Sequence, residues 1–345
     1  MNKILSIIVP SYNMEAYLPK CLGSLVVDDK ELLQKLDVIV VNDGSKDRTS
    51  EIAHGFEAKY PQTFRVIDKQ NGNYGSCINS ALPMAIGKYV KILDADDSFN
   101  NTALPLFIKY LETTNSDLVV SDFVYVREHE DGHVKKSFEM LNGLACICDV
   151  PIEFCKEVQM QAVAYNRNVF QNLAYKQTEG ISYTDQEWMF YPMSNVKTLS
   201  YVPLTIYQYL VGREGQTINR EALLRNRWMV LDITQRFVDW LPFDDVDAGC
   251  EAARYLVNRL LNQLHIVYST CLLDPLRFDR LDRLMALDKS LSEKLPLIYA
   301  ASESFCPNNV LRLKFVRYYR KCNRADTGLM LRCYRALCYL KRLFE

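Results

Sequence analysis

The sequence predicts an α/β fold in which a parallel sheet is covered by helices and followed by a helical C-terminal region. Over the first hundred residues, four short apolar runs alternate with amphipathic stretches, which is the pattern of βαβ units. Runs that are apolar on both faces suit a parallel sheet, because helices cover both of its sides. After Glu221, apolar residues recur every three to four positions, as they do on helices. The four expected strands are residues 4–9, 38–41, 64–67 and 89–93.

The remaining elements divide the chain into three expected parts. Between residues 117 and 210 the pattern is mixed, with strand-like runs at 118–126 and 198–203 and a helix that opens at Thr184. Helical spacing then covers residues 225–240, 248–268 and 279–295. We predict a sheet-containing domain over residues 1–217, a helical region over 218–309 and a basic amphipathic tail over 310–345.

The composition excludes several classes of protein. Of the 345 residues, 49 % are hydrophobic and 24 % are charged, which is typical of a globular chain. Eleven cysteines without a Cys-x-x-Cys pair, and only four histidines, indicate neither a disulfide framework nor a structural metal, so we expect a reducing cytoplasm. The run at 4–9 is too short for a signal peptide, and no uncharged apolar stretch approaches the roughly 20 residues that span a bilayer.

The net charge of −1 hides an asymmetry, because residues 310–345 carry ten basic and two acidic residues, a net charge of +8. Near its end, Arg332, Arg335 and Arg342 fall on one side of a helical wheel beside a broad apolar face. We expect two short helices, separated near residues 323–328, that lie on an anionic membrane surface or on a membrane-bound partner. Association would then be peripheral, on the inner face of the cell membrane. The alternative is that the apolar face packs on the rest of the chain. The leucine and aromatic content argues against a nucleic-acid partner.

A group of carboxylates follows the fourth expected strand, at the edge of the sheet where ligands bind in such folds. Asp94, Asp96 and Asp97 stand in the segment Asp-Ala-Asp-Asp. One or two of these carboxylates could hold Mg²⁺ or Mn²⁺ while diphosphate oxygens complete its coordination shell. The alternative is a loop in which Asp97 and Ser98 cap the next helix.

Asp43 follows the second expected strand in the segment Asn42-Asp43-Gly44-Ser45. Its carboxylate could accept a hydrogen bond from the imide N–H of uracil or from a ribose hydroxyl. Tyr12, after the first strand, offers a flat face for a base. Equally, residues 42–45 could be a simple turn between a strand and a helix.

A glycine-flanked loop at residues 212–217 follows the apolar run 204–211. Arg213 could bind a diphosphate through its planar donors, and Gln216 could supply a neutral donor. An exposed turn explains the glycines equally well.

Asp185 stands at the expected start of a helix, after Thr184 and two residues before Glu187. Thr184 and Glu187 have the spacing of a capping box, which would leave the Asp185 carboxylate free near the positive end of the helix dipole. A carboxylate there could take the proton of an attacking hydroxyl. The alternative is an acidic first turn that stabilises a surface helix.

Taken together, five ordered motifs resemble family 2 of the glycosyltransferases. The likeness covers roughly residues 3–217 and is strongest before Asn101. Its motifs are residues 7–13 (IIVPSYN), 41–47 (VNDGSKD), 71–75 (NGNYG), 87–90 (GKYV) and 94–98 (DADDS).

The resemblance implies a GT-A fold, a UDP-sugar donor, a divalent metal and inversion at the anomeric carbon. It implies that Pro10, Tyr12 and Asp43 line the uridine pocket, with Lys69 and Asn73 close by. In the same way it assigns Asp94 to the ribose, Asp96 to the metal and Asp185 to the catalytic base. The loop 212–217, with Arg213 and Gln216, is similar to the family's loop that folds over the diphosphate. One departure is Thr184, because glutamate often precedes the base.

Three alternative functions can be tested against these sequence features. A nicotinamide dehydrogenase needs Gly-x-Gly-x-x-Gly after the first strand, and residues 10–13 contain no glycine. A P-loop phosphotransferase is disfavoured because its motif is absent from the sequence. A non-catalytic relative that binds nucleotide-sugar or glycan to scaffold an assembly complex would be marked by loss of Asp96 or Asp185, and both are present. The resemblance points to a glycan or lipid-linked acceptor in bacterial surface polysaccharide synthesis.

Overall fold

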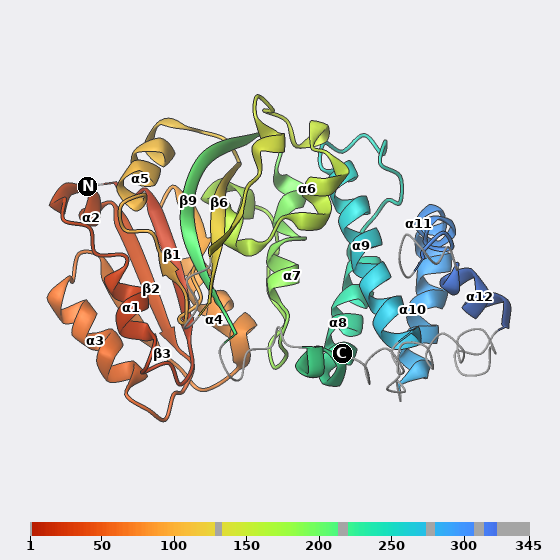
Figure 1. Cartoon of the computed structure of the whole chain (residues 1–345), viewed down its shortest axis with the longest axis horizontal. Helices are drawn as coiled ribbons and strands as arrows, with labels where there is room; N and C mark the ends of the chain where they lie inside the picture. The colour runs from red at the N-terminus through yellow and green to blue at the C-terminus, as the bar shows by residue number, and fades with distance from the viewer. Residues whose placement is uncertain (1, 128–132, 213–219, 274–279, 307–313, 323–345) are drawn as a thin grey trace. The chain divides into compact units, whose positions relative to one another are not determined.

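A nine-stranded sheet organises the N-terminal part of the chain in the computed structural model (Figure 1). The structure describes residues 2–127, 133–212, 220–273, 280–306 and 314–322. The chain divides into two compact units, residues 1–216 and 217–345. The predicted separation of a helical region from a tail at residue 310 stays a prediction.

The four expected strands are confirmed, and they lie side by side in parallel in the order β3-β2-β1-β4. On the other side of β4, β8 runs antiparallel to both β4 and β6, and β9 runs parallel to β6. The carboxyl ends of β1, β2, β3, β4, β6 and β9 therefore face the same edge of the sheet. The strands are β1 (Leu5–Ser11), β2 (Leu36–Asn42), β3 (Phe64–Asp68), β4 (Tyr89–Ile92), β5 (Ser98–Phe99), β6 (Leu118–Arg127), β7 (His133–Lys136), β8 (Val163–Asn166) and β9 (Leu199–Val211).

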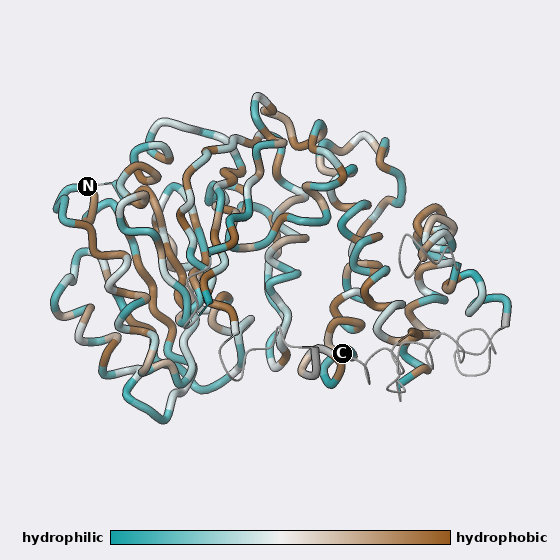
Figure 2. Tube along the Cα trace, in the orientation of Figure 1, coloured by the Kyte–Doolittle hydropathy of each residue, from teal (hydrophilic) through white to brown (hydrophobic). Residues whose placement is uncertain are grey.

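Short helices connect these strands, and the centre of the sheet is apolar. Every residue of β1, β2 and β4 is buried, as expected for a parallel sheet covered on both faces, and Figure 2 shows the hydrophobic residues that run along the strands. The α-helices are α1 (Leu18–Gly23), α2 (Lys30–Gln34), α3 (Thr49–Lys59), α4 (Asn73–Ala81), α5 (Leu104–Thr113), α6 (Ile152–Glu157) and α7 (Asp185–Trp188). The 3-10 helices are η1 (Leu82–Met84), η2 (Glu139–Leu141), η3 (Ile147–Asp149), η4 (Met160–Ala162), η5 (Arg167–Phe170) and η6 (Pro192–Asn195).

The second unit is helical, as the apolar spacing predicts. Leu256, Leu260 and Leu264 recur every fourth residue on α9 and are fully buried. Its helices are α8 (Arg220–Trp240), α9 (Ala253–Leu272), α10 (Leu281–Lys294), α11 (Pro296–Ser302) and α12 (Phe315–Cys322). Among the residues that the structure describes, no helix is both long enough and apolar enough to cross a bilayer.

The first helix of the predicted tail, α12, packs into this second unit, which corrects the expectation of a surface-lying helix there. Phe315 and Val316 are fully buried. Arg320 places its guanidinium 2.8 Å from the Asp288 carboxylate and 3.5 Å from the centre of the Tyr299 ring. Its charge is therefore neutralised inside the fold. The rest of the tail, from residue 323, lies outside the described residues.

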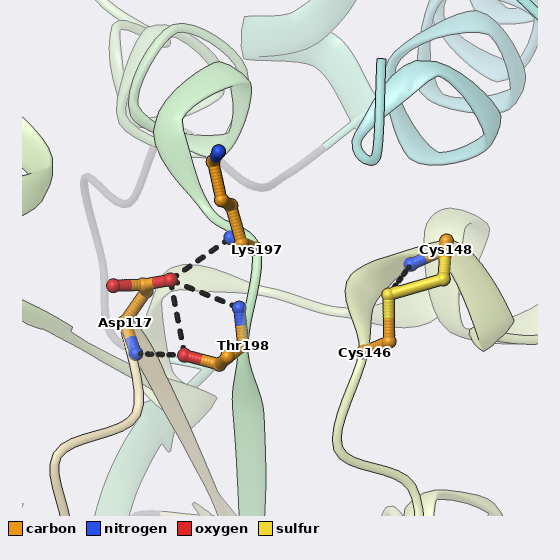
Figure 3. Close-up of a disulfide and its surroundings, with 5 residues drawn as sticks. All are labelled: Asp117, Cys146, Cys148, Lys197 and Thr198. Carbon is orange, nitrogen blue, oxygen red and sulfur yellow. Dashed lines mark hydrogen bonds between the residues drawn. A yellow bond between two sulfur atoms is a disulfide. The ribbon is translucent and has the colours of Figure 1, made fainter. Parts of the chain in front are cut away.

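A disulfide joins Cys146 and Cys148, although the cysteine pattern predicts no disulfide framework (Figure 3). One residue separates this pair, whereas a Cys-x-x-Cys pair has two. The 3-10 turn of η3 brings the two Cα atoms to 5.2 Å, within the range that a disulfide spans. Beside it, the Asp117 carboxylate accepts hydrogen bonds from the backbone N–H groups of Lys197 and Thr198, the two residues before β9.

Candidate active site

Asp43 forms the centre of a polar cluster at the carboxyl ends of β2 and β3. The Lys69 ammonium lies 2.7 Å from Asp43 Oδ1, and the backbone N–H of Gly72 donates to the same oxygen at 3.0 Å. Lys69 also donates to Ser76 Oγ at 2.8 Å, and Ser76 donates to the backbone carbonyl of Asn73 at 2.7 Å. The structure thus brings together three of the residues expected near the nucleotide, namely Asp43, Lys69 and Asn73.

The loops after β1 and β2 hold each other in place beside this cluster. Asn13, with a left-handed φ of 52°, accepts from the N–H of Lys46 at 2.9 Å and donates its own N–H to Ser45 Oγ at 3.0 Å. Tyr12, one residue earlier, is 43 % exposed, so its ring is free to meet a base. Pro10 is a buried residue of β1, opposite Val41 of β2. Its contact with a nucleotide stays a prediction.

Asp97 is the best-anchored carboxylate of the Asp94–Asp97 segment. It is only 2 % exposed, and it accepts hydrogen bonds from the Tyr207 hydroxyl at 2.6 Å and from the Leu210 N–H at 2.8 Å. Burial, and then the nearby charges of Asp94 and Asp96, raise the pKa of Asp97 well above its usual value. The alternative of a helix cap at Asp97 and Ser98 is wrong, because Ser98 begins β5 and the next helix starts at Leu104.

Asp94 and Asp96 remain partly exposed on the same loop. The backbone N–H of Asp94 donates to the Tyr207 hydroxyl at 3.1 Å, and its carboxylate accepts from the Tyr74 hydroxyl at 2.9 Å. With Asp97 turned into the protein, Asp96 is a partly exposed carboxylate that could contact a metal. This fits Mg²⁺ or Mn²⁺, which bind through one or two protein carboxylates and take further oxygens from phosphates and water.

Asp185 is the first residue of α7, as expected, but the capping box does not form. Thr184 Oγ1 is buried without a hydrogen-bond partner. Glu187 instead turns back to accept from the backbone N–H of Thr178 at 2.6 Å and from its hydroxyl at 2.7 Å. The Asp185 carboxylate is not free either, because the Gln186 side-chain amide donates to it at 3.1 Å. Tertiary contacts to residue 178, rather than local capping, therefore set the start of this helix.

Tyr74 connects the two acidic groups. Burial is the main cause that raises its pKa well above the usual value, and the charges of Asp94 and Asp185 both add to this. Asp94 contacts this hydroxyl directly, whereas Asp185 acts on it through its charge. The segment that leads to α7 is itself held against α4, where a Cβ at Gly75 would come within 2.2 Å of the Thr178 carbonyl oxygen.

Sequence reasoning missed Tyr74, Tyr207 and a buried lysine. Lys91 of β4 is fully buried and donates to the backbone carbonyls of Gln161 at 2.7 Å and Val163 at 3.0 Å. Burial lowers its pKa to about 7. The sequence offered two signals for these residues. Tyr74 lies inside the motif 71–75, and Lys91 is a charged residue inside an apolar run. Arg213 and Gln216 lie outside the described residues.

Comparison with known proteins identifies the family of the chain. Residues 6–188, slightly more than half of the chain, match the family described as Glycosyl transferase family 2. The chain belongs to this family of glycosyltransferases. Its motifs and its mixed α/β fold agree with the resemblance seen in the sequence, and the enzyme class is that of a transferase.

Several curated glycosyltransferases are similar to part of this chain. The uncharacterized glycosyltransferase MG025 of Mycoplasma genitalium is 33 % identical over 138 residues, 39 % of this chain and 45 % of the relative. The uncharacterized glycosyltransferase EpsJ of Bacillus subtilis is 34 % identical over 123 residues, 36 % of this chain and 35 % of the relative. The hyaluronan synthase of Pasteurella multocida is 24 % identical over 265 residues, 74 % of this chain and 26 % of the relative. The matches span less than half the length of these relatives.

Among solved structures, the fold is similar to that of TarS of S. aureus, residues 1–349, crystallised in complex with UDP-GlcNAc. The TM-score is 0.67 at 18 % identity, and the match covers 99 % of this glycosyltransferase and 92 % of that chain. At this identity the likeness shows a shared fold.

Proposed function

We propose that this glycosyltransferase transfers a sugar from a UDP-sugar to a hydroxyl of a glycan or lipid-linked acceptor, with inversion and with the help of Mn²⁺ or Mg²⁺. The observation that carries the proposal is the hydrogen bond from the Tyr74 hydroxyl to Asp94 at the carboxyl edge of the sheet, with Asp185 at the start of α7 near enough for its charge to act on the same hydroxyl. Asp94 would contact the sugar donor, and Asp185 would contact the acceptor hydroxyl that attacks it.

The nucleotide would bind at the Asp43 cluster. Asp43 Oδ1 is occupied by Lys69 and Gly72, whereas its second oxygen accepts from no residue in the described part of the chain. That oxygen could accept the imide N–H of uracil, and the exposed ring of Tyr12 could cover the base. The structure of TarS with UDP-GlcNAc supports the choice of a uridine nucleotide. Arg213 and Gln216 would then bind the diphosphate.

Asp96 would hold the divalent metal, and Asp94 would contact the ribose. When bound, such a metal neutralises the charge that develops on the leaving diphosphate. The protein itself fixes the loop that carries Asp96. It does so through two hydrogen bonds that Asp97 accepts from β9, one from the Tyr207 hydroxyl and one from the Leu210 N–H.

Asp185 would act as the base. It would accept the proton of the acceptor hydroxyl while that oxygen attacks the anomeric carbon and the bond to the UDP oxygen breaks on the opposite side. Attack from the face opposite the leaving group inverts the anomeric configuration. The likeness to hyaluronan synthase supports a role in polysaccharide synthesis.

A donor screen tests the proposed function. The full chain would be incubated with Mn²⁺ and UDP-glucose, UDP-galactose or UDP-N-acetylglucosamine, while UDP release is measured and the affinity for UDP is determined by calorimetry. We expect UDP to bind, and one donor to give saturable UDP release that EDTA suppresses. Failure to bind UDP and to turn over any donor would contradict the proposal, whereas UDP binding without turnover of any donor would favour a scaffolding relative.

A further inference from the structure

Tyr209 stands at the rim of the candidate active site, near the end of β9. Residues two apart on a strand share a face and are separated by about 6.6 Å along it. Tyr209 is therefore on the same face as Tyr207, whose hydroxyl contacts Asp97 and the Asp94 N–H, and it lies one step closer to the carboxyl edge. It is half-buried rather than buried like Tyr207.

Tyr125 supports one side of this ring. The two tyrosines are direct partners across β6 and β9, which run side by side in Figure 1, and their ring centres are 5.6 Å apart. Tyr125 is itself held in place, because the Gln159 amide donates to its hydroxyl at 3.1 Å and Phe123 contacts its ring at 5.2 Å. The pair forms a supported aromatic wall that is still partly open to solvent.

The hydroxyl of Tyr209 differs from those of its neighbours. Tyr74, Tyr125 and Tyr207 all place their hydroxyls in hydrogen bonds, whereas Tyr209 has no such partner within the described ranges. A tyrosine hydroxyl with its usual pKa of about 10 is already protonated at neutral pH, and burial, followed by the charges of Asp94, Asp97 and Asp185, raises the pKa of Tyr209 further. A partly open ring with an unused donor beside carboxylates suits a ligand with an apolar face and hydroxyl groups.

The order of strands indicates which ligand this is. The Asp43 cluster belongs to β2 and β3, and the Asp94–Asp97 loop follows β4. β6 and β9 lie beyond β4, on the side away from β2 and β3. A donor that extends from the Asp43 cluster ends with its sugar near Asp94 and Asp96. The side of the site formed by β6 and β9 is then left for the acceptor. The Tyr125–Tyr209 pair therefore lies on the side from which the acceptor would enter.

We infer that Tyr209, supported by Tyr125, binds the pyranose ring of the acceptor, with the C–H face of the sugar against the tyrosine ring and a sugar hydroxyl accepting from the Tyr209 hydroxyl. This inference rests on the proposed function, because it takes the donor to lie along β2 to β4. It narrows the acceptor to a molecule that presents a pyranose to this edge of the sheet.

The experiment measures glycan binding separately from donor binding. Saturation-transfer NMR on the full chain, with diamagnetic Mg²⁺ and UDP present, would use the methyl glycosides of glucose, galactose and N-acetylglucosamine as probes. The variants are Tyr209→Leu, Tyr209→Phe and the control Tyr201→Leu. Tyr201 is also half-buried on β9 but lies near the opposite end of the strand, where its hydroxyl donates to Asp122.

We expect at least one probe to bind the wild-type chain and the control equally well. Tyr209→Leu should weaken that binding about fivefold to tenfold, and Tyr209→Phe by about twofold to fivefold, while UDP affinity stays unchanged. The inference is overturned if no probe binds the wild type, or if a folded Tyr209→Leu chain binds as the wild type does. If calorimetry shows that the wild type does not bind UDP, the proposed function fails, whereas glycan binding measured without UDP still decides the role of Tyr209.

Discussion

The Tyr207 hydroxyl lies 2.6 Å from the Asp97 carboxylate, and this contact joins two segments that are 110 residues apart. Asp97 also accepts from the N–H of Leu210, one residue before the end of β9. The loop after β4 and the end of β9 are therefore fastened to each other through one buried carboxylate. The end of β9, after which the sequence continues into residues 212–217, is thereby fixed beside the Asp94–Asp97 loop.

Removal of the Tyr207 hydroxyl should impair activity more than removal of the equally buried Tyr89 hydroxyl, which lies away from the site. Tyr207→Phe leaves a buried carboxylate oxygen without its donor, which should cost roughly 1–3 kcal/mol of stability and reduce kcat/KM about tenfold or more. The matched control is Tyr89→Phe, because Tyr89 is also buried and donates to the carbonyls of Thr114 and Ser116, away from the site. Urea unfolding and steady-state kinetics check both variants. Equal kinetic losses in the two would mean that Tyr207 is only structural.

Asp96→Ala should abolish metal-dependent transfer. The variant removes the proposed metal ligand, so the leaving diphosphate loses its counter-charge, and we expect at least roughly a hundredfold fall in turnover and no response to added Mn²⁺. Asp28→Ala, at an exposed aspartate before α2, serves as the control and should behave as the wild type. The measurement is UDP release over a Mn²⁺ titration. Wild-type activity of Asp96→Ala in EDTA would refute both the metal and its proposed ligand.

Asp185→Asn should separate donor binding from chemistry. The amide keeps the size of the side chain but cannot take a proton, so turnover should fall by about two to four orders of magnitude. Calorimetry should find UDP affinity close to that of the wild type, since Asp43 and Lys69 are untouched. Unchanged turnover would instead assign Asp185 to the folding of α7.

Lys91 should make stability depend on pH in a specific direction. Burial lowers its folded-state pKa to about 7, while an unfolded lysine titrates near about 10.4. Between these values the unfolded chain binds more protons, so the free energy of unfolding contributed by this group rises as pH increases from about 7 to 10. Each pH unit contributes at most about 1.4 kcal/mol.

Comparison with Lys91→Met isolates that contribution. Urea unfolding at several pH values between about 7 and 10 should show that the free energy of unfolding rises more steeply with pH in the wild type than in Lys91→Met. Parallel pH profiles of the two proteins would show that Lys91 keeps its charge in the folded state.

The tail calls for two truncations rather than one, because α12 belongs to the fold. A chain that ends at Cys322 keeps the Arg320 to Asp288 ion pair, whereas a chain that ends at Asn309 loses it and leaves Asp288 with the Tyr268 hydroxyl but without a cation, at a cost of up to roughly 3–5 kcal/mol. Residues 323–345 carry five basic and two acidic residues, and each basic residue near an anionic surface contributes about 1 kcal/mol.

We therefore expect the full chain to co-sediment with anionic vesicles at low salt, and the chain that ends at Cys322 to stay in the supernatant with its thermal stability unchanged. Only the shorter chain should lose stability. If the full chain stays in the supernatant under all conditions, the membrane role of residues 310–345 is wrong.

The parallel strands and the polar residues at their ends follow from the sequence alone. The apolar runs that precede Asp43 and Asp94 are long enough and apolar enough to be buried strands, and parallel strands bring their carboxyl ends to one edge. The apolar pattern and the family resemblance together predict a common site for Asp43, Lys69, Asp94 and Asp185, and the structure shows the contact of Lys69 with Asp43.

How these groups are held depends on the tertiary structure, because their partners are distant in the chain. Tyr207 reaches Asp97 across 110 residues, and Lys91 finds its carbonyl acceptors 70 and 72 residues away. The expected capping box at Thr184 failed although the competing partner is only nine residues away, since Thr178 offers Glu187 two donors outside the helical turn. Residue spacing predicts contacts between residues that are close in the sequence. A buried polar group instead forms hydrogen bonds with whichever partner the fold brings to it.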